Sequence, residues 1–176
     1  YRDYVTNNYT KSNGGTLAET SDPIILQLLS PSNLDILLDG AQYTRTEKTK
    51  NIADLPLAQK HLNVCVNSSD EHVKATNCGY CSKCLRTMMA LDSIDALQKF
   101  SKVFDLSQWK KYSFGYKCEQ VFRYKYDSFA QDNVDFARKH RKYLPNKFVA
   151  TIVVCYLKAK SLPSRVIRKL KKMGNG

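Results

Sequence analysis

The amino-acid sequence predicts an α/β fragment that is predominantly helical, with a short parallel-sheet remnant among the helices, a cysteine knuckle and a helical C-terminal region. Three observations predict this fold class. The 176 residues are 43% hydrophobic and 25% charged, so the chain can bury a core. A short apolar run that ends in Asp-Gly is typical of a buried strand before a turn. Apolar residues recur at helical spacing through most of the second half.

The distribution of charge divides the chain. Residues 1–98 carry 9 Lys and Arg against 11 Asp and Glu, and residues 99–176 carry 19 against 5, so the net charges are −2 and +14. We therefore expect an irregular lead-in over residues 1–18, an α/β part over residues 19–98 and a basic helical region over residues 99–176.

Several classes of protein are excluded. The longest apolar stretch, residues 148–157, is shorter than the roughly 18 residues that a transmembrane helix needs, so no such helix is expected. The clustered cysteines differ from secreted disulfide frameworks, and we expect a cytoplasmic protein that can lie at the periphery of a membrane. The first residues contain neither an initiator Met nor a secretory signal pattern, which indicates that the numbering starts inside a longer chain.

The first regular elements are expected between residues 34 and 66. The apolar run 34–38, closed by Asp39-Gly40, predicts a strand and a tight loop. Thr44 and Glu47 fit the S/T-x-x-E capping box, which predicts a helix that ends before Pro56. Residues 61–66 predict a second short strand that leads into the first clustered cysteine.

A largely apolar helical segment is expected over residues 84–97, and its apolar side chains should pack inward: Leu85, Met88, Met89, Leu91, Ile94 and Leu97. The Met pair is interpreted as core filling. Cys118 and Cys155 stand apart from the other cysteines among apolar and aromatic neighbours, so both are expected to be small buried hydrophobic residues.

The second half is expected to be mostly helical. Phe122, Tyr126 and Phe129 fall at i, i+4 and i+7, which predicts one helix with an aromatic stripe facing an apolar partner. Further helices are expected over residues 132–143, over residues 147–160, and in a last segment that Pro163 and Gly174 bracket.

The cysteine spacing is the most specific motif. Cys65-x12-Cys78-x2-Cys81-x2-Cys84 supplies four thiolates at intervals that suit a tetrahedral ion, and Gly79 lets backbone amides bend toward the sulfurs. With four protein ligands the site is interpreted as structural zinc and not as a Lewis-acid catalyst. An iron–sulfur cluster, or a site without metal that forms disulfides or free thiols, remains an alternative.

Several strings resemble a bacterial family of mostly uncharacterised PP-loop proteins, which look like adenine nucleotide alpha hydrolase-type ATP pyrophosphatases. The strings are S-D-P at 21–23, L-D-G at 38–40, T-R-T-E-K-T at 44–49, I-A-D at 52–54 and N-C-G-Y-C-S-K-C-L-R-T at 77–87. The cysteine arrangement is similar to the C-terminal zinc site of 7-cyano-7-deazaguanine synthase, from which four zinc ligands carry over: Cys65, Cys78, Cys81 and Cys84. The resemblance covers about residues 19–98.

The resemblance implies a parallel α/β sheet that binds ATP at the carboxyl ends of its strands, cleaves it between the alpha and beta phosphates and activates a substrate as an adenylate. The S-G-G-x-D-S loop of the family is absent, since the nearest string, Ser12-Asn13-Gly14-Gly15, lacks the acidic and second Ser positions. We therefore expect the C-terminal part of an ATP-dependent ligase-like or hydrolase-like enzyme, or a truncated relative. ATP would bind only with an upstream PP-loop domain, and this chain alone would be inactive.

Substrate or nucleotide contacts are expected just beyond the first strand, because open α/β sheets bind ligands at the carboxyl ends of their strands. Asp39, Arg45, Glu47 and Lys48 occupy that region, and Arg86 follows the last cysteine. Alternatives remain open for the last four. Glu47 can serve the capping box alone, Arg45 and Lys48 can lie on a solvated face, and Arg86 can form a local ion pair.

The last segment predicts a basic amphipathic helix. Val166, Ile167, Leu170 and Met173 line one face, and cations crowd the rest: Arg165, Arg168, Lys169, Lys171 and Lys172. The alternative function is therefore a zinc-stabilised binding module whose basic half contacts RNA, an anionic membrane or a protein partner. A terminal helix docked on its own core, with a solvated basic face, explains the same pattern. A third possibility for the function of the chain is a purely structural remnant.

Overall fold

The computed structural model describes residue 33, residues 43–65 and residues 75–173, with side chains as far as residue 160. Its elements are, in order, α3 (Arg45–Asn51), α4 (Pro56–His61), α5 (Ser82–Ser93), the 3-10 helix η1 (Leu97–Phe100), α6 (Leu106–Arg123), α7 (Ser128–Lys139) and α8 (Lys147–Met173). The predominantly helical prediction is confirmed. The expected lead-in, the strand over residues 34–38 and Asp39 lie outside the described residues.

The predicted second strand over residues 61–66 is wrong where it can be examined. His61 ends α4, and residues 62–65 pair with no strand. Among the described residues, the one strand-like pairing is a single parallel bridge between Asn77 and Phe104. A sheet remnant is therefore not seen in this part of the chain.

The fully buried side chain of Asn77 takes the place of a strand partner. Its Oδ1 accepts from the Val64 amide at 2.8 Å, and its Nδ2 donates to the carbonyls of Leu62 at 2.8 Å and Val103 at 3.0 Å. Its own backbone amide donates to Val103 at 3.1 Å. One side chain thus satisfies backbone groups of two segments that are far apart in sequence but close in space.

The capping box predicted for the first helix is confirmed. The Thr44 amide donates to Glu47 Oε2 at 2.9 Å, and the Glu47 amide donates to Thr44 Oγ1 at 3.3 Å. Thr46, almost fully buried, donates from its amide at 3.1 Å and its hydroxyl at 2.7 Å to Asp132 of α7. These bonds fix the start of α3 against α7.

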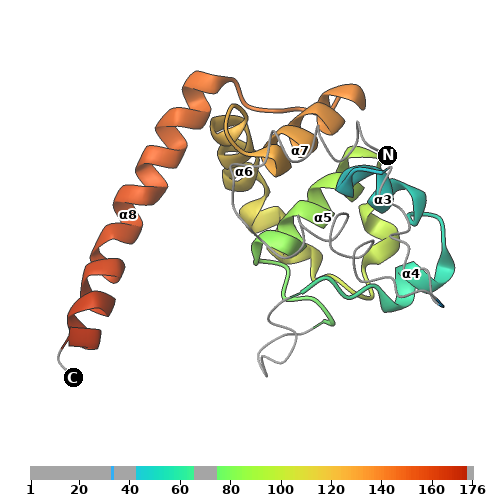
Figure 1. The fold of residues 1–176 in the computed structure, drawn as a ribbon, viewed down its shortest axis with the longest axis horizontal. Coiled ribbons are helices and arrows are strands. Elements are labelled where there is room, and N and C mark those ends of the chain that lie inside the picture. The colour runs from blue at the N-terminus through green and yellow to red at the C-terminus, as the bar shows by residue number, and fades with distance from the viewer. Residues whose placement is uncertain (1–32, 34–42, 66–74, 174–176) are drawn as a thin grey trace.

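Helix α5 lies at the centre of the molecule and contacts α3, α6 and α7 (Figure 1). Its predicted apolar face is confirmed, since Leu85, Met88, Met89 and Leu91 are buried. The helix ends four residues earlier than predicted. Asp95 adopts a left-handed conformation with φ of 57°, and the chain resumes in η1. The larger core joins α5 to η1, to α6 and to α7, so residues on both sides of residue 98 share it.

The single aromatic helix predicted through residues 122–129 is wrong. Helix α6 ends at Arg123, and Asp127 caps a new helix by accepting from the amides of Phe129 at 2.9 Å and Ala130 at 3.1 Å. Tyr126 lies in the turn between the two helices and is 47% exposed. The carboxylate cap therefore overrides an aromatic spacing that only resembled a helical repeat.

The last two predicted helices are one, because α8 runs without a break from Lys147 to Met173 and passes through Pro163. Ala150 and Val154 pack on a second core that includes Cys118 of α6. Cys118 is fully buried, as predicted, but Cys155 is exposed. Successive residues of a helix point in different directions, so Val154 packs on the core while Cys155, the next residue, points away from it. Figure 1 shows α8 leading away from the other helices.

Candidate metal centre

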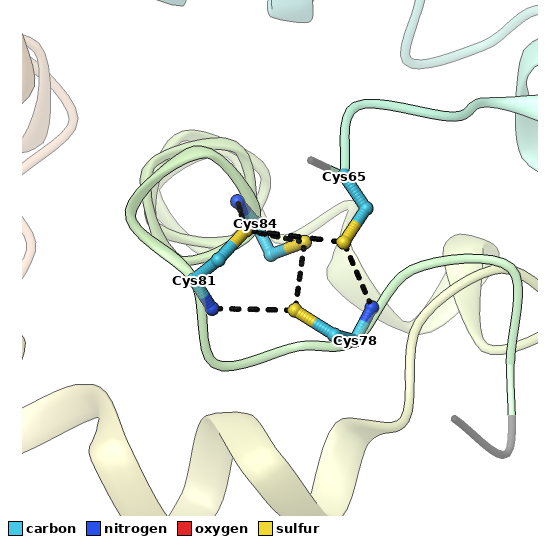
Figure 2. A group of neighbouring side chains, drawn as sticks. All are labelled: Cys65, Cys78, Cys81 and Cys84. Atoms are coloured by element: carbon cyan, nitrogen blue, oxygen red, sulfur yellow. Dashed lines mark hydrogen bonds between the residues drawn. The ribbon is translucent and has the colours of Figure 1, made fainter. Parts of the chain in front are cut away.

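Two segments supply the four clustered cysteines. Cys65 follows α4, whereas Cys78, Cys81 and Cys84 form the knuckle that leads into α5 (Figure 2). All four Sγ atoms lie within 4.8 Å of one another. The Sγ distances are 3.4 Å between Cys81 and Cys84, 3.8 Å between Cys78 and Cys84, and 4.0 Å between Cys65 and Cys81.

These distances fit a single tetrahedral ion. With metal–sulfur bonds of about 2.3 Å, the sulfurs of a tetrahedral site lie about 3.8 Å apart. A cluster of several irons and sulfides would hold its cysteine sulfurs farther apart than this. A disulfide needs a sulfur–sulfur distance of about 2.05 Å, and all six cysteines are free thiols in the structure. The donor set therefore suits one ion better than a multinuclear cluster or disulfides.

Backbone amides of the knuckle point at the sulfurs. The amides of Cys78, Cys81 and Cys84 donate to the Sγ atoms of Cys65, Cys78 and Cys81 at 3.5, 3.4 and 3.5 Å. Cys81 is also the N-cap of α5, so its sulfur satisfies one amide at the start of that helix, that of Cys84. Such amides stabilise thiolates, which are the form that binds a metal.

Two of the thiols are deeply buried. Cys84 is fully buried and Cys78 is 4% exposed. Burial raises the pKa of both thiols, and hydrogen bonds with neighbouring cysteines raise it further. For Cys84, repulsion from Cys81 and Cys78 raises the pKa as well. Amide donors act in the opposite direction. A bound cation would offset both the burial and the repulsion, since metal binding displaces the thiol protons.

The knuckle is packed against the start of α6 through Gly79. Its φ is +74°, in the left-handed region that glycine adopts without strain. A Cβ at this position would lie 2.9 Å from the Cβ of Gln108. The sequence suggested only that Gly79 helps the loop to bend, whereas the structure shows that its backbone also lies close to Gln108 of α6.

Asn77 is a residue of this centre that sequence reasoning missed. It precedes Cys78 and binds the backbone on the N-terminal side of Cys65, so it ties together the two segments that carry the four clustered cysteines. Its place beside the first knuckle cysteine was visible in the sequence, but its burial and its long-range bonds were not.

The structure brings two of the predicted contact residues together on Phe129 of α7. The guanidinium carbon of Arg86 lies 3.9 Å from the centre of the Phe129 ring, and that of Arg45 lies 5.7 Å from it. Burial lowers the pKa of Arg86, and the nearby Tyr116 phenol acts in the opposite direction. Neither arginine forms an ion pair within the described residues, and Arg86 Nε is buried without a hydrogen-bond partner.

The other predicted contact residues lie elsewhere or serve other roles. Glu47 completes the capping box of α3, and Lys48 is exposed on the same helix. Five cations fall within α8, although their side chains lie outside the described residues: Arg165, Arg168, Lys169, Lys171 and Lys172.

A cavity of about 480 Å³ near the end of α3 includes none of the predicted contact residues. Both acidic residues that line it are already engaged in ion pairs, Asp54 with Lys99 at 2.6 Å and Asp95 with Lys142. His140 also lines it, and burial lowers the pKa of this imidazole. The cavity therefore offers no chemistry comparable with the cysteine centre.

A fold alone assigns no activity, so function must be argued from the residues of the site. Comparison of the chain with protein-family models, with curated proteins and with solved structures gives no match.

Proposed function

We propose that the chain is a zinc-stabilised helical module of a PP-loop-type, ATP-dependent adenylating protein, and that it is not catalytically complete alone. The observation that carries the zinc centre is that four cysteine Sγ atoms from two segments lie within 4.8 Å of one another. The link to PP-loop chemistry is supported by the resemblance of the sequence strings over residues 19–98.

Zinc is the ion that this donor set favours. Four thiolates with amide donors are typical of closed structural zinc sites, and zinc itself is not redox-active. A mononuclear iron site would have a similar geometry, so the metal has to be identified by measurement.

The role of the zinc in this proposal is structural. The four cysteines would fill all four positions of a tetrahedral ion, which would leave none for a substrate or a water. Its binding energy would contribute to folding by fixing the segment that carries Cys65 to the start of α5.

A phosphate-bearing substrate would find its contacts at Arg45 and Arg86. The nearby carboxylates have other partners, since Asp127 caps α7 and pairs with Arg123, and Asp132 binds Thr46. Two guanidinium groups beside one ring without a paired carboxylate leave positive charge that a phosphate can neutralise.

Metal content and pyrophosphate release test this proposal together. We expect one zinc per chain, lost in Cys65→Ser and retained in Cys155→Ser, whose thiol is exposed and remote from the cluster in sequence. We also expect no pyrophosphate when the zinc-loaded chain is incubated with ATP. A chain without zinc contradicts the metal centre, and release of pyrophosphate by the chain unaided contradicts the incomplete catalytic apparatus.

A second candidate function, a basic binding module, is favoured by the net charge of +14 over residues 99–176. It does not depend on ATP chemistry. In this proposal the zinc centre holds the helical body together, and the basic region contacts an anionic partner.

A further inference from the structure

Helix α8 carries a row of apolar side chains that no part of the described structure covers. Phe148 is 75% exposed, Ile152 is 53% exposed and Tyr156 is 64% exposed. They are spaced four residues apart, so they share one side of the helix. Ala150 and Val154 occupy the opposite side and pack on α6 and α7. The outward row is therefore not needed for the packing of α8.

The same repeat continues in the sequence of α8. At 3.6 residues per turn, the positions of Ala159, Val166 and Leu170 stay in register with those of Phe148 and Ile152. From Phe148 to Leu170 the apolar row would be about 33 Å long at 1.5 Å per residue.

The charge of α8 has one sign. Its 27 residues include eight Lys and Arg and no Asp or Glu. Five of the eight cations lie in its last nine residues. A helix that combines an exposed apolar row with cations alone is complementary to a surface that offers both an apolar layer and negative charge.

We propose that α8 lies along the surface of an anionic lipid bilayer, with the row of Phe148, Ile152 and Tyr156 in the interface and its cations among the headgroups. The row gains free energy by leaving water for the boundary of the acyl chains. The helix would lie on the membrane and not cross it; no helix within the described part of the chain is long and apolar enough for a span.

The apolar row favours a lipid surface over the other occupants. RNA would bind the cations, but it offers no apolar phase for an aliphatic side chain such as Ile152. A second copy of α8 could cover the row, yet it would bring eight like charges against eight. This proposal rests on α8 alone and holds whether or not the protein has PP-loop chemistry.

Flotation of the zinc-loaded full chain with vesicles tests the proposal. The vesicles consist of phosphatidylcholine alone or of phosphatidylcholine and phosphatidylglycerol in equal amounts. We expect binding to the mixed vesicles that weakens as salt is added, and little binding to phosphatidylcholine.

Matched variants separate the apolar row from general exposure. Phe148→Glu with Ile152→Glu should weaken binding by more than about tenfold, because two interfacial side chains become charged. The control is Leu57→Glu with Leu55→Glu, since these side chains are 74% and 53% exposed but lie at α4. Both pairs leave the buried core intact, which thermal unfolding checks.

A second pair of variants tests the cations. Neutralising Lys169, Lys171 and Lys172 with Gln should weaken binding about a hundredfold, at about fivefold for each cation near the surface. The same change at exposed Lys50, Lys60 and Lys102, outside α8, should have a much smaller effect. The proposal would be overturned if variant and control lost vesicle binding equally. It would also be overturned if the chain bound single-stranded RNA but not vesicles, or if dimerisation accounted for the burial of Phe148.

Discussion

Replacement of Asn77 by Ala should destabilise the protein strongly, because this one side chain makes several buried hydrogen bonds. The side chain is fully buried and makes three hydrogen bonds, with the amide of Val64 and the carbonyls of Leu62 and Val103. At a net value of about 1 kcal/mol each, their loss lowers the free energy of unfolding by about 3 kcal/mol, out of roughly 5–15 kcal/mol for a typical domain. The melting temperature should fall by roughly 6–12 °C.

Urea unfolding followed by circular dichroism, with excess zinc present, measures this effect. Asn77→Asp should be at least as destabilising as Asn77→Ala, because it removes both amide donors and places a carboxylate in a buried position. Asn51→Ala, an exposed position on α3, is the control and should stay within about 0.5 kcal/mol of the parent. If Asn77→Ala also stays within that range, Asn77 does not hold together the two segments that carry the clustered cysteines.

Three further predictions concern the packing around the centre. Gly79→Ala should lower stability by about 1–3 kcal/mol in the same urea assay, because φ is +74° and the new Cβ would meet Gln108 at 2.9 Å; an unchanged midpoint contradicts this reasoning. Asp132→Ala should lower the free energy of unfolding by about 2 kcal/mol, because it removes both hydrogen bonds to Thr46. It should also reduce the protection of the α3 amides in hydrogen exchange, and unchanged stability and protection would contradict a role of Asp132 in holding α3 against α7. Burial raises the pKa of Tyr116 from 10.0 to about 12, so this phenol contributes stability that is fully present below pH 10.0 and lost as the pH rises through about 12. Stability measured across that window should therefore decline less in Tyr116→Phe than in the parent, and parallel curves would contradict the assignment.

Local signals in the sequence predicted the local features of the fold. The Thr44 and Glu47 cap involves two residues three apart, and the structure forms it as predicted. The cysteine spacing likewise predicted that three cysteines share one knuckle with Cys65 as the distant fourth, and the structure brings their four sulfurs together. In both cases the information lies within a short segment, where backbone geometry leaves few alternatives.

Features that depend on tertiary packing were not predicted. Residues 62–65 form no strand, and the side chain of Asn77, far away in the sequence, bonds to the backbone of Leu62 and Val64 instead. Cys118 and Cys155 have similar apolar neighbours in sequence, yet only Cys118 faces a helix that buries it. Periodicity alone also cannot show a cap such as Asp127 inside an aromatic repeat.

The zinc dependence of folding tests the central claim most directly. The protein is stripped with a chelator, its thermal unfolding is recorded, and zinc is added back in stoichiometric amounts. Zinc removal should lower the melting temperature by at least roughly 6–12 °C, equivalent to about 3 kcal/mol, and one zinc per chain should restore it. Cys84→Ser should show the low value with or without zinc, while Cys155→Ser should behave as the parent. A stripped chain that unfolds at the same temperature as the zinc-loaded chain would contradict a centre that holds this fold together.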